Sequence, residues 1–228
     1  MAKYKLVVFD MAGTTIRDKG NVAESFVNAF DQNKLSISVT EVNKVMGWRK
    51  KDAIKMLLKL YHPQTEINEE ALIENIHTNF ISNMITFYRQ DKDLQPLPFA
   101  EELFKQCKAK GIKVALNTGF TKSITDVLLH QLQWEEGKQM DAVISSDEVK
   151  EGRPHPYMIE KLMFRFGIDD AMMVAKIGDT EVDVQEGRNA GCGLVVSITT
   201  GAYTRKQLEQ FNPDKIIDNL HELTALIL

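Results

Sequence analysis

The strongest constraint on the fold is a set of short, apolar, β-rich runs, each followed by a stretch with helical periodicity. Five runs are clear and a sixth is weaker: KLVVFD (5–10), KVALNT (113–118), DAVISS (141–146), VAKIGD (174–179), LVVSIT (194–199) and KIID (215–218). Near-continuous apolar strands that alternate with helices indicate a parallel sheet covered on both faces. We therefore expect a doubly wound, Rossmann-like α/β fold with its site at the carboxyl ends of the strands.

The first two runs are separated by about a hundred residues, far more than a single crossover connection needs. Helical periodicity occupies most of this interval, over residues 23–35 and 69–89. Between them, Thr40 is a candidate helix cap for a segment that runs to about Tyr61. The interval therefore predicts an inserted helical domain.

Two segments that flank this insertion, residues 14–22 and 91–99, are expected to be hinge strands. We predict a core domain made of residues 1–16 and 97–228, and a helical cap made of residues 17–96. Because the insertion begins directly beyond the first strand, the cap should be able to close over a substrate and exclude water.

Charge and hydropathy exclude several classes of protein. The net charge of −4 provides no basic field for nucleic acid or anionic lipid, and no apolar run is long enough to span a membrane. The first strand is expected within a few residues of the N-terminus, in MAKYKLVVFD, which leaves no room for a secretory signal. Cys107 and Cys192 lie far apart and in no metal-type spacing. We expect a reduced, cytoplasmic protein.

Polar residues stand at four of the expected strand ends. Asp10 ends the first strand, Thr118 and Gly119 follow the second, Arg153 lies in the loop EGRPHPYM beyond the third, and Asp179 opens GDTEVD after the fourth. Because carboxyl ends of parallel strands meet at one edge of a sheet, these residues should form one site.

The chemistry of this set suits a phosphoryl group and a divalent cation. Two converging aspartates repel each other unless a cation such as Mg²⁺ lies between their oxygens. The Thr118 hydroxyl, the Gly119 amide and the Arg153 guanidinium can bind phosphoryl oxygens. An aspartate beside such a group can attack phosphorus and form an aspartyl-phosphate.

These motifs resemble the haloacid dehalogenase superfamily, in the branch with a helical cap after the first motif. The resemblance spans the chain from Asp10 to the segment GDTEVDVQEGRNAG. It implies that Asp10 is the nucleophile and that Mg²⁺ is held by Asp10, the backbone carbonyl of Ala12 and Asp179. It further implies that Asp183 supports Asp179, and that Thr118 and Arg153 hold the phosphoryl group.

Ala12 narrows the resemblance to one branch. Ordinary phosphatases and mutases of this superfamily have an aspartate here, which serves as general acid and base, and alanine cannot replace it. The stretch DMAGTT with GRPHP at 152–156 resembles phosphonoacetaldehyde hydrolase, or phosphonatase. In that family the leaving group is carbon, and a cap lysine forms an imine that accepts the electrons of the C–P bond.

The cap stretch VMGWRKKDAIKML resembles the family's lysine motif and gives that role to Lys50, with Lys51 as the alternative. Imine formation needs a neutral amine, so burial must lower the pKa of this lysine. Two positions depart from the family pattern: Ala53 stands where a histidine is usual, and Phe120 stands where a tyrosine is usual.

Three functions are therefore open. The first is a Mg²⁺-dependent phosphonatase-like hydrolase, the second is a phosphomonoesterase of the phosphoglycolate phosphatase type, and the third is an inactive protein that binds a phosphate ligand. All three imply a small-molecule phosphonate or phosphate partner. The family resemblance also suggests a homodimer formed through the cap.

Overall fold

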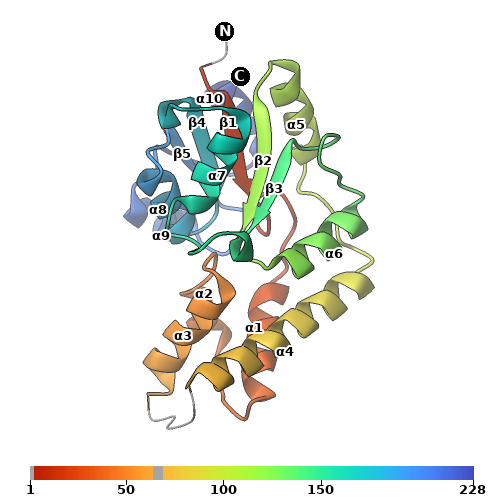
Figure 1. Cartoon of the computed structure of the whole chain (residues 1–228), viewed down its shortest axis with the longest axis vertical. Coiled ribbons are helices and arrows are strands. Elements are labelled where there is room, and N and C mark those ends of the chain that lie inside the picture. Colours follow the sequence, from red (N-terminus) through yellow and green to blue (C-terminus); the bar gives the residue numbers. More distant parts are fainter. Residues whose placement is uncertain (1–2, 64–68) are drawn as a thin grey trace.

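Six parallel strands form the single sheet at the centre of the computed structural model, which describes residues 3–63 and 69–228 (Figure 1). The strands are β1 (Leu6–Asp10), β2 (Lys113–Thr118), β3 (Ala142–Ser145), β4 (Val174–Gly178), β5 (Leu194–Ile198) and β6 (Lys215–Ile217). Their order is β3-β2-β1-β4-β5-β6, so the direction of winding reverses between β1 and β4. This confirms the predicted doubly wound fold, in which a crevice opens at the reversal point.

Helices cover both faces of the sheet, as the apolar strands require. All five residues of β1 are buried. Leu6 and Val8 belong to one apolar cluster, whereas Val7 and Phe9 belong to the other. The covering helices are α5 (Ala100–Ala109), α6 (Lys122–Leu132), α7 (Tyr157–Phe166), α8 (Glu181–Asn189), α9 (Arg205–Leu208) and α10 (Thr224–Ile227). Because successive side chains of a strand point to opposite faces, β1 contributes to both halves of the core.

The described residues between β1 and α5 form four helices beyond the carboxyl ends of the strands (Figure 1). These cap helices are α1 (Asn21–Asp31), α2 (Val39–Asn43), α3 (Lys50–Tyr61) and α4 (Glu69–Gln90). Their buried apolar side chains belong to the same cluster as one face of the sheet, and within it the rings of Phe26 and Phe80 lie 4.4 Å apart. The helices thus form a lid at the edge of the sheet where the site residues were expected.

The segment from Thr40 to Tyr61 differs from the sequence prediction. Ser38, not Thr40, caps α2, because its hydroxyl accepts from the amide of Glu41 and its own amide donates to the Glu41 carboxylate. This reciprocal capping box favours the earlier start. The helix then ends at Asn43, and a loop with Gly47 at φ +82° precedes α3. The loop points the backbone of Gly47 towards the core.

The two connections between core and cap run side by side but form only an isolated bridge, between Ile16 and Pro96. Backbone bonds from Arg17 to Gln95 and from Leu97 to Thr15 extend this pairing. The prediction of hinge strands over 14–22 and 91–99 is therefore wrong: neither segment forms a strand, and Asn21 already begins α1. The domain boundaries at 16/17 and 96/97 stay a prediction. No helix of the described residues is long and apolar enough to cross a membrane.

Candidate active site

The carboxyl ends of the central strands bring the sequence-predicted residues to one cavity. Asp10 ends β1, Thr118 ends β2, and Asp179 follows β4. All three side chains line the same small cavity, together with Gly119 and Ala12. Lys50, at the first turn of α3 in the cap, lines it from the opposite side. The cavity therefore lies between the sheet and the cap helices.

Asp10 is buried and is held by a single strong ionic contact. Arg153 donates from Nη1 to Asp10 Oδ1 at 2.7 Å. Burial raises the pKa of Asp10 to about 6, while the charge of Arg153 opposes this rise and that of Asp183 adds to it. Arg153 thus orients the carboxylate and leaves Oδ2 available to the cavity.

Asp179 is fixed by two donors from separate segments. Thr14 Oγ1 donates to Asp179 Oδ1 at 3.1 Å, and the backbone amide of Ala202 donates to Oδ2 at 2.7 Å. Burial, followed by repulsion from Asp10 and Asp183, raises the pKa of Asp179 well above its usual range. Two buried carboxyl groups that repel each other are the electrostatic condition that a divalent cation relieves.

The donors around this pair fit Mg²⁺. Asp10, Asp179 and the backbone carbonyl of Ala12 offer only oxygen atoms, which this cation prefers. The backbone approaches Asp179 closely: a side-chain carbon at Gly13 or Gly201 would come within 2.8 or 2.0 Å of Asp179 Oδ2. Within residues 3–63 and 69–228, no cluster of three His, Cys, Asp or Glu side chains could hold a metal. A cation here would rely on two carboxylates and a carbonyl.

Beneath the cavity lies a fully buried ionic network that the sequence analysis did not foresee. Lys176 of β4 donates to Asn117 Oδ1 at 2.7 Å and pairs with Asp183 at 2.9 Å. Glu186 of α8 accepts from Arg153 Nε at 3.1 Å and from Asn117 Nδ2 at 2.9 Å. A lysine inside an apolar strand was the available signal, since such a charge requires a buried partner.

Arg153 and Asp183 occupy this network and do not line the cavity. Arg153 pairs with Asp183 at 3.0 Å and donates from Nη2 to the backbone oxygen of Asn117 at 2.9 Å. Asp183 accepts from the hydroxyl of Thr180 and also from its backbone amide, and the amide bond forms part of the capping box of α8. Gly178 has no room for a side chain, because a Cβ atom there would lie 2.1 Å from the carboxyl carbon of Asp183. The network thus holds Arg153 against the floor of the cavity, next to Asp10.

The cap is closed on the core in this structure. A side-chain carbon at Gly119 would come within 2.6 Å of the Trp48 carbonyl oxygen, and one at Gly47 within 2.3 Å of Thr180 Oγ1. Arg49 donates across the same interface to the carbonyl oxygen of Lys150 at 2.9 Å. The loop before α3 therefore seals one side of the cavity against the ends of β2 and β4.

Lys50 is buried among aromatic rings. Its side chain is 3% exposed. Its Nζ atom lies 5.1, 5.5 and 5.8 Å from the ring centres of Phe120, Phe26 and Phe80. Burial lowers the pKa of Lys50 to about 8, although Asp10 raises it and Arg153 lowers it further. At pH 7.5 about a quarter of the amine is therefore neutral, against about 0.1% for an ordinary lysine.

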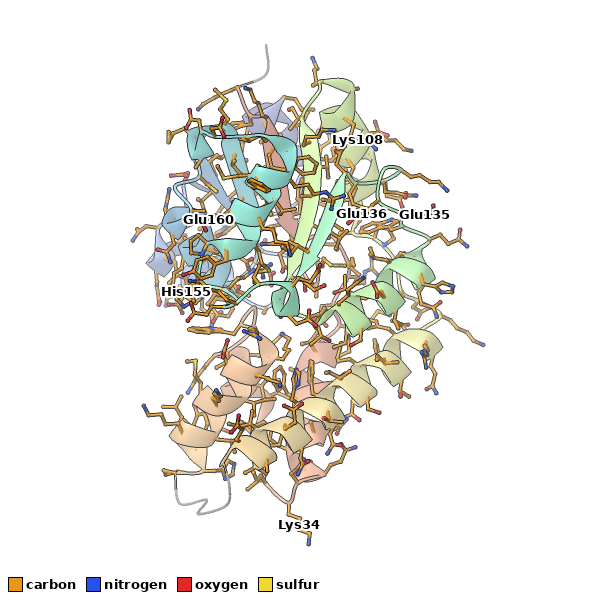
Figure 2. All side chains as sticks on the ribbon, in the orientation of Figure 1. Lys34, Lys108, Glu135, Glu136, His155 and Glu160 are labelled. Carbon is orange, nitrogen blue, oxygen red and sulfur yellow. The ribbon has the colours of Figure 1, made fainter. Side chains whose placement is uncertain are left out.

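Lys51, the alternative to Lys50, points elsewhere: it forms an ion pair with Glu74 and is partly exposed. His155 also lies away from the cavity, on the surface of the core, where Figure 2 labels it. Its ring stacks on Tyr157 at 5.7 Å. Neither side chain is placed to act on a group held between Asp10 and Lys50.

One carboxylate in the cavity lining was missed by the sequence analysis. Asp18 lies on the connection between β1 and α1 and lines the cavity with Lys50. Its Oδ1 atom accepts from the amide of Gly20 at 2.9 Å. The sequence gives no signal for this residue, because the course of the connection between core and cap brings it to the site.

Comparisons with known proteins identify the family and agree with the fold. A family model described as haloacid dehalogenase-like hydrolase matches residues 4–191. Phosphonoacetaldehyde hydrolase from Bacillus cereus is 29% identical over 222 residues, which cover 92% of this chain and 83% of the relative.

Two solved structures share the fold. A hydrolase from Pseudomonas syringae has a TM-score of 0.85 at 18% identity, covering 97% of this chain and 96% of that one. A phosphonoacetaldehyde hydrolase-like protein from Oleispira antarctica has a TM-score of 0.81 at 21% identity, covering 98% of this chain and 91% of that one.

Proposed function

The chain belongs to the haloacid dehalogenase-like hydrolase family, and we propose that it is a Mg²⁺-dependent hydrolase that cleaves the carbon–phosphorus bond of a small phosphonate aldehyde. The observation that carries this proposal is the buried amine of Lys50 in the same closed cavity as the carboxylate of Asp10. An amine and a carboxylate on opposite walls suit a substrate with a carbonyl at one end and a phosphoryl group at the other.

The reaction begins at Lys50. Its neutral amine adds to the aldehyde carbon, and loss of water leaves a positively charged iminium beside the C–P bond. This iminium can accept the two electrons of that bond, which convert it into a neutral enamine. Burial of Lys50 favours the neutral amine and excludes bulk water, although the three ring faces near its Nζ atom attract the charged form.

Asp10 receives the phosphoryl group. One of its oxygens attacks phosphorus as the C–P bond breaks, and water later hydrolyses the aspartyl-phosphate to inorganic phosphate. Protonation of the enamine carbon and hydrolysis of the imine release acetaldehyde from phosphonoacetaldehyde. Thr118 and Gly119 are proposed to hold the phosphoryl oxygens in the cavity. Arg153, whose guanidinium donates to Asp10, Asn117 and Glu186, is proposed to stabilise the transferred group through its positive charge from beneath Asp10.

Mg²⁺ would be held by Asp10, the Ala12 carbonyl and Asp179, with Asp183 as the supporting residue. It would neutralise charge on the transferring phosphoryl oxygens. The methyl group of Ala12 agrees with a carbon leaving group, because the electrons of the broken bond go to the iminium and no alkoxide needs a proton.

The decisive experiment is incubation with phosphonoacetaldehyde and borohydride, followed by mass spectrometry. We expect release of phosphate in the untreated reaction and, after reduction, a two-carbon adduct on Lys50. Lys50→Met should abolish both signals, whereas the matched control Lys51→Met should retain them, because Lys51 pairs with Glu74 outside the cavity.

Other outcomes identify the competing functions. Hydrolysis of phosphate monoesters such as phosphoglycolate without any lysine adduct would replace this proposal with a phosphomonoesterase. Binding of phosphate or Mg²⁺ without turnover of any phosphonate or ester would indicate an inactive ligand-binding protein.

A further inference from the structure

Among the described residues, the lining of the cavity contains neither the histidine nor the tyrosine that the family resemblance leads us to expect beside the imine. Ala12 and Phe120 both present apolar side chains to it, and Ala53 is fully buried in α3. Asp10 is assigned to phosphorus and Asp179 to the cation. Of the carboxylates that line the cavity, Asp18 alone has no assigned role.

Asp18 is held in a defined orientation on the side of the cavity that faces the cap. It stands eight residues beyond Asp10, just before the first turn of α1. Backbone amides at the start of α1 bind its carboxyl group, among them that of Gly20, which donates to Oδ1 at 2.9 Å. The two oxygens of a carboxylate offer about four acceptor sites, so a carboxyl group held by backbone amides can still exchange a proton with a ligand.

We propose that Asp18 is a catalytic acid–base residue that exchanges protons with the substrate oxygen during formation and hydrolysis of the Lys50 imine. This inference rests on the proposed function. Neither Ala53 nor Phe120 can transfer a proton near the imine. The inference assigns this proton transfer to a residue of the connection between core and cap.

The step balances as follows. The Lys50 amine adds to the carbonyl carbon, and one amine proton passes to the carbonyl oxygen to give the neutral carbinolamine. The protonated Asp18 then gives its proton to the carbinolamine hydroxyl, which leaves as water. The nitrogen lone pair then forms the C=N bond, which yields the iminium and the Asp18 carboxylate. In the reverse step, this carboxylate takes a proton from the water that attacks the product iminium.

Electrostatics at both groups supports this exchange. Burial raises the pKa of Asp18, while backbone amides at the start of α1 and the charge of Lys50 lower it. The charge of Asp18 in turn raises the pKa of Lys50, as do those of Asp10 and Asp179. Tyr88 of α4 also faces Asp18, but burial raises its pKa well above the usual range, so its hydroxyl stays protonated.

The test uses a probe that forms imines without any phosphonate. The whole protein is treated with formaldehyde and cyanoborohydride, and methylation of each lysine is followed by mass spectrometry in wild type and Asp18→Asn. Asparagine keeps an acceptor for the Gly20 amide but cannot transfer the proton. Lys51 serves as the internal control in the same spectrum.

Loss of the Asp18 charge by itself favours the neutral amine and would make Lys50 react faster. Acid–base catalysis predicts the opposite: methylation of Lys50 should slow by about tenfold or more, while that of Lys51 stays constant. Faster or unchanged methylation of Lys50 would overturn the assignment. If the asparagine variant is unstable, Asp18→Ser, which also offers an oxygen to the amide, repeats the comparison.

A second measurement separates this inference from the proposed function. With phosphonoacetaldehyde, Asp18→Asn should lower kcat by about 10² to 10⁴-fold. Wild-type turnover with full activity in the variant would refute the role of Asp18 and leave the proposed function standing. No wild-type turnover, together with slower formaldehyde labelling in the variant, would refute the phosphonate substrate and support Asp18.

Discussion

Burial of the Lys50 amine should cost the protein stability, and Lys50→Met should recover it. Methionine has nearly the same length as lysine and can fill the space between Phe26, Phe80 and Phe120 without a charge. The variant thereby removes the desolvated amine while it keeps apolar contacts. Lys50 would then be a residue that the proposed reaction needs but that lowers the stability of the fold.

The magnitude follows from the pKa of the amine. Burial lowers this pKa from 10.5 to about 8. The difference corresponds to about 3 kcal/mol, the amount by which the folded state resists protonation of Lys50. Below pH 8 both states bind the proton, and the wild type carries the whole cost. Between pH 8 and 10.5 only the unfolded state binds it, so wild-type stability rises with pH across this window.

Urea denaturation of both proteins at pH 7 and pH 9.5 measures this cost. We expect Lys50→Met to be more stable by up to about 3 kcal/mol at pH 7, and this advantage to shrink by about 2 kcal/mol at pH 9.5. EDTA should be present, so that no bound cation changes the field at the site. Lys51→Met, which breaks an exposed ion pair, should change stability by at most about 1 kcal/mol.

An equal advantage at both pH values would show that packing, and not desolvation, accounts for the change. A less stable variant at pH 7 would show that the amine is not held in an apolar site. Either result would remove the physical basis for a neutral Lys50 at physiological pH.

Three further predictions test other parts of the site. Ala12→Asp should raise the rate of phosphate ester hydrolysis, measured by phosphate release from p-nitrophenyl phosphate, and an unchanged or lower rate would contradict our interpretation of Ala12. Lys176→Met should lower the free energy of unfolding, measured in urea, by about 3–5 kcal/mol, because it leaves the buried carboxylate of Glu186 with less compensating positive charge. An unchanged free energy of unfolding would mean that the buried network does not need the charge of Lys176. Gly119→Ala should lower kcat/KM by about 100-fold, because its Cβ atom would meet the Trp48 carbonyl oxygen when the cap closes, and wild-type kinetics would exclude that closure as a step.

The sheet could be predicted from the sequence because its signals are local. All six predicted strands of the sheet are present to within one residue at each end, and β2 has the predicted bounds, whereas the two predicted hinge strands are not formed. The break between α2 and α3 could not be predicted, because 39–61 carries helix-forming residues on both sides of Gly47. At this break the backbone of Gly47 packs against Thr180, a residue that lies far away in the sequence, so no local pattern could reveal it.

The candidate site divides in the same way. Asp10, Thr118 and Asp179 could be predicted as neighbours, since parallel strands place their carboxyl ends together. Asp18 and Glu186 could not, because a hinge and a helix interior carry no comparable signal. Glu186 stands three residues after Asp183 on α8, a spacing that shares one helix face but is common to many surface helices.

The sequence by itself determined how the elements follow one another along the chain. It shows which runs form the strands of the sheet, which polar residues end those strands, and that a helical insertion follows the first strand. These features depend on periodicity and on residues adjacent in the chain. Only the tertiary structure decided the chemical state of the site. The pKa of Lys50 depends on three aromatic rings from α1, α4 and the loop after β2, and on carboxylates from the core. Desolvation is a property of the closed assembly of cap and core, and no local pattern in the chain encodes it.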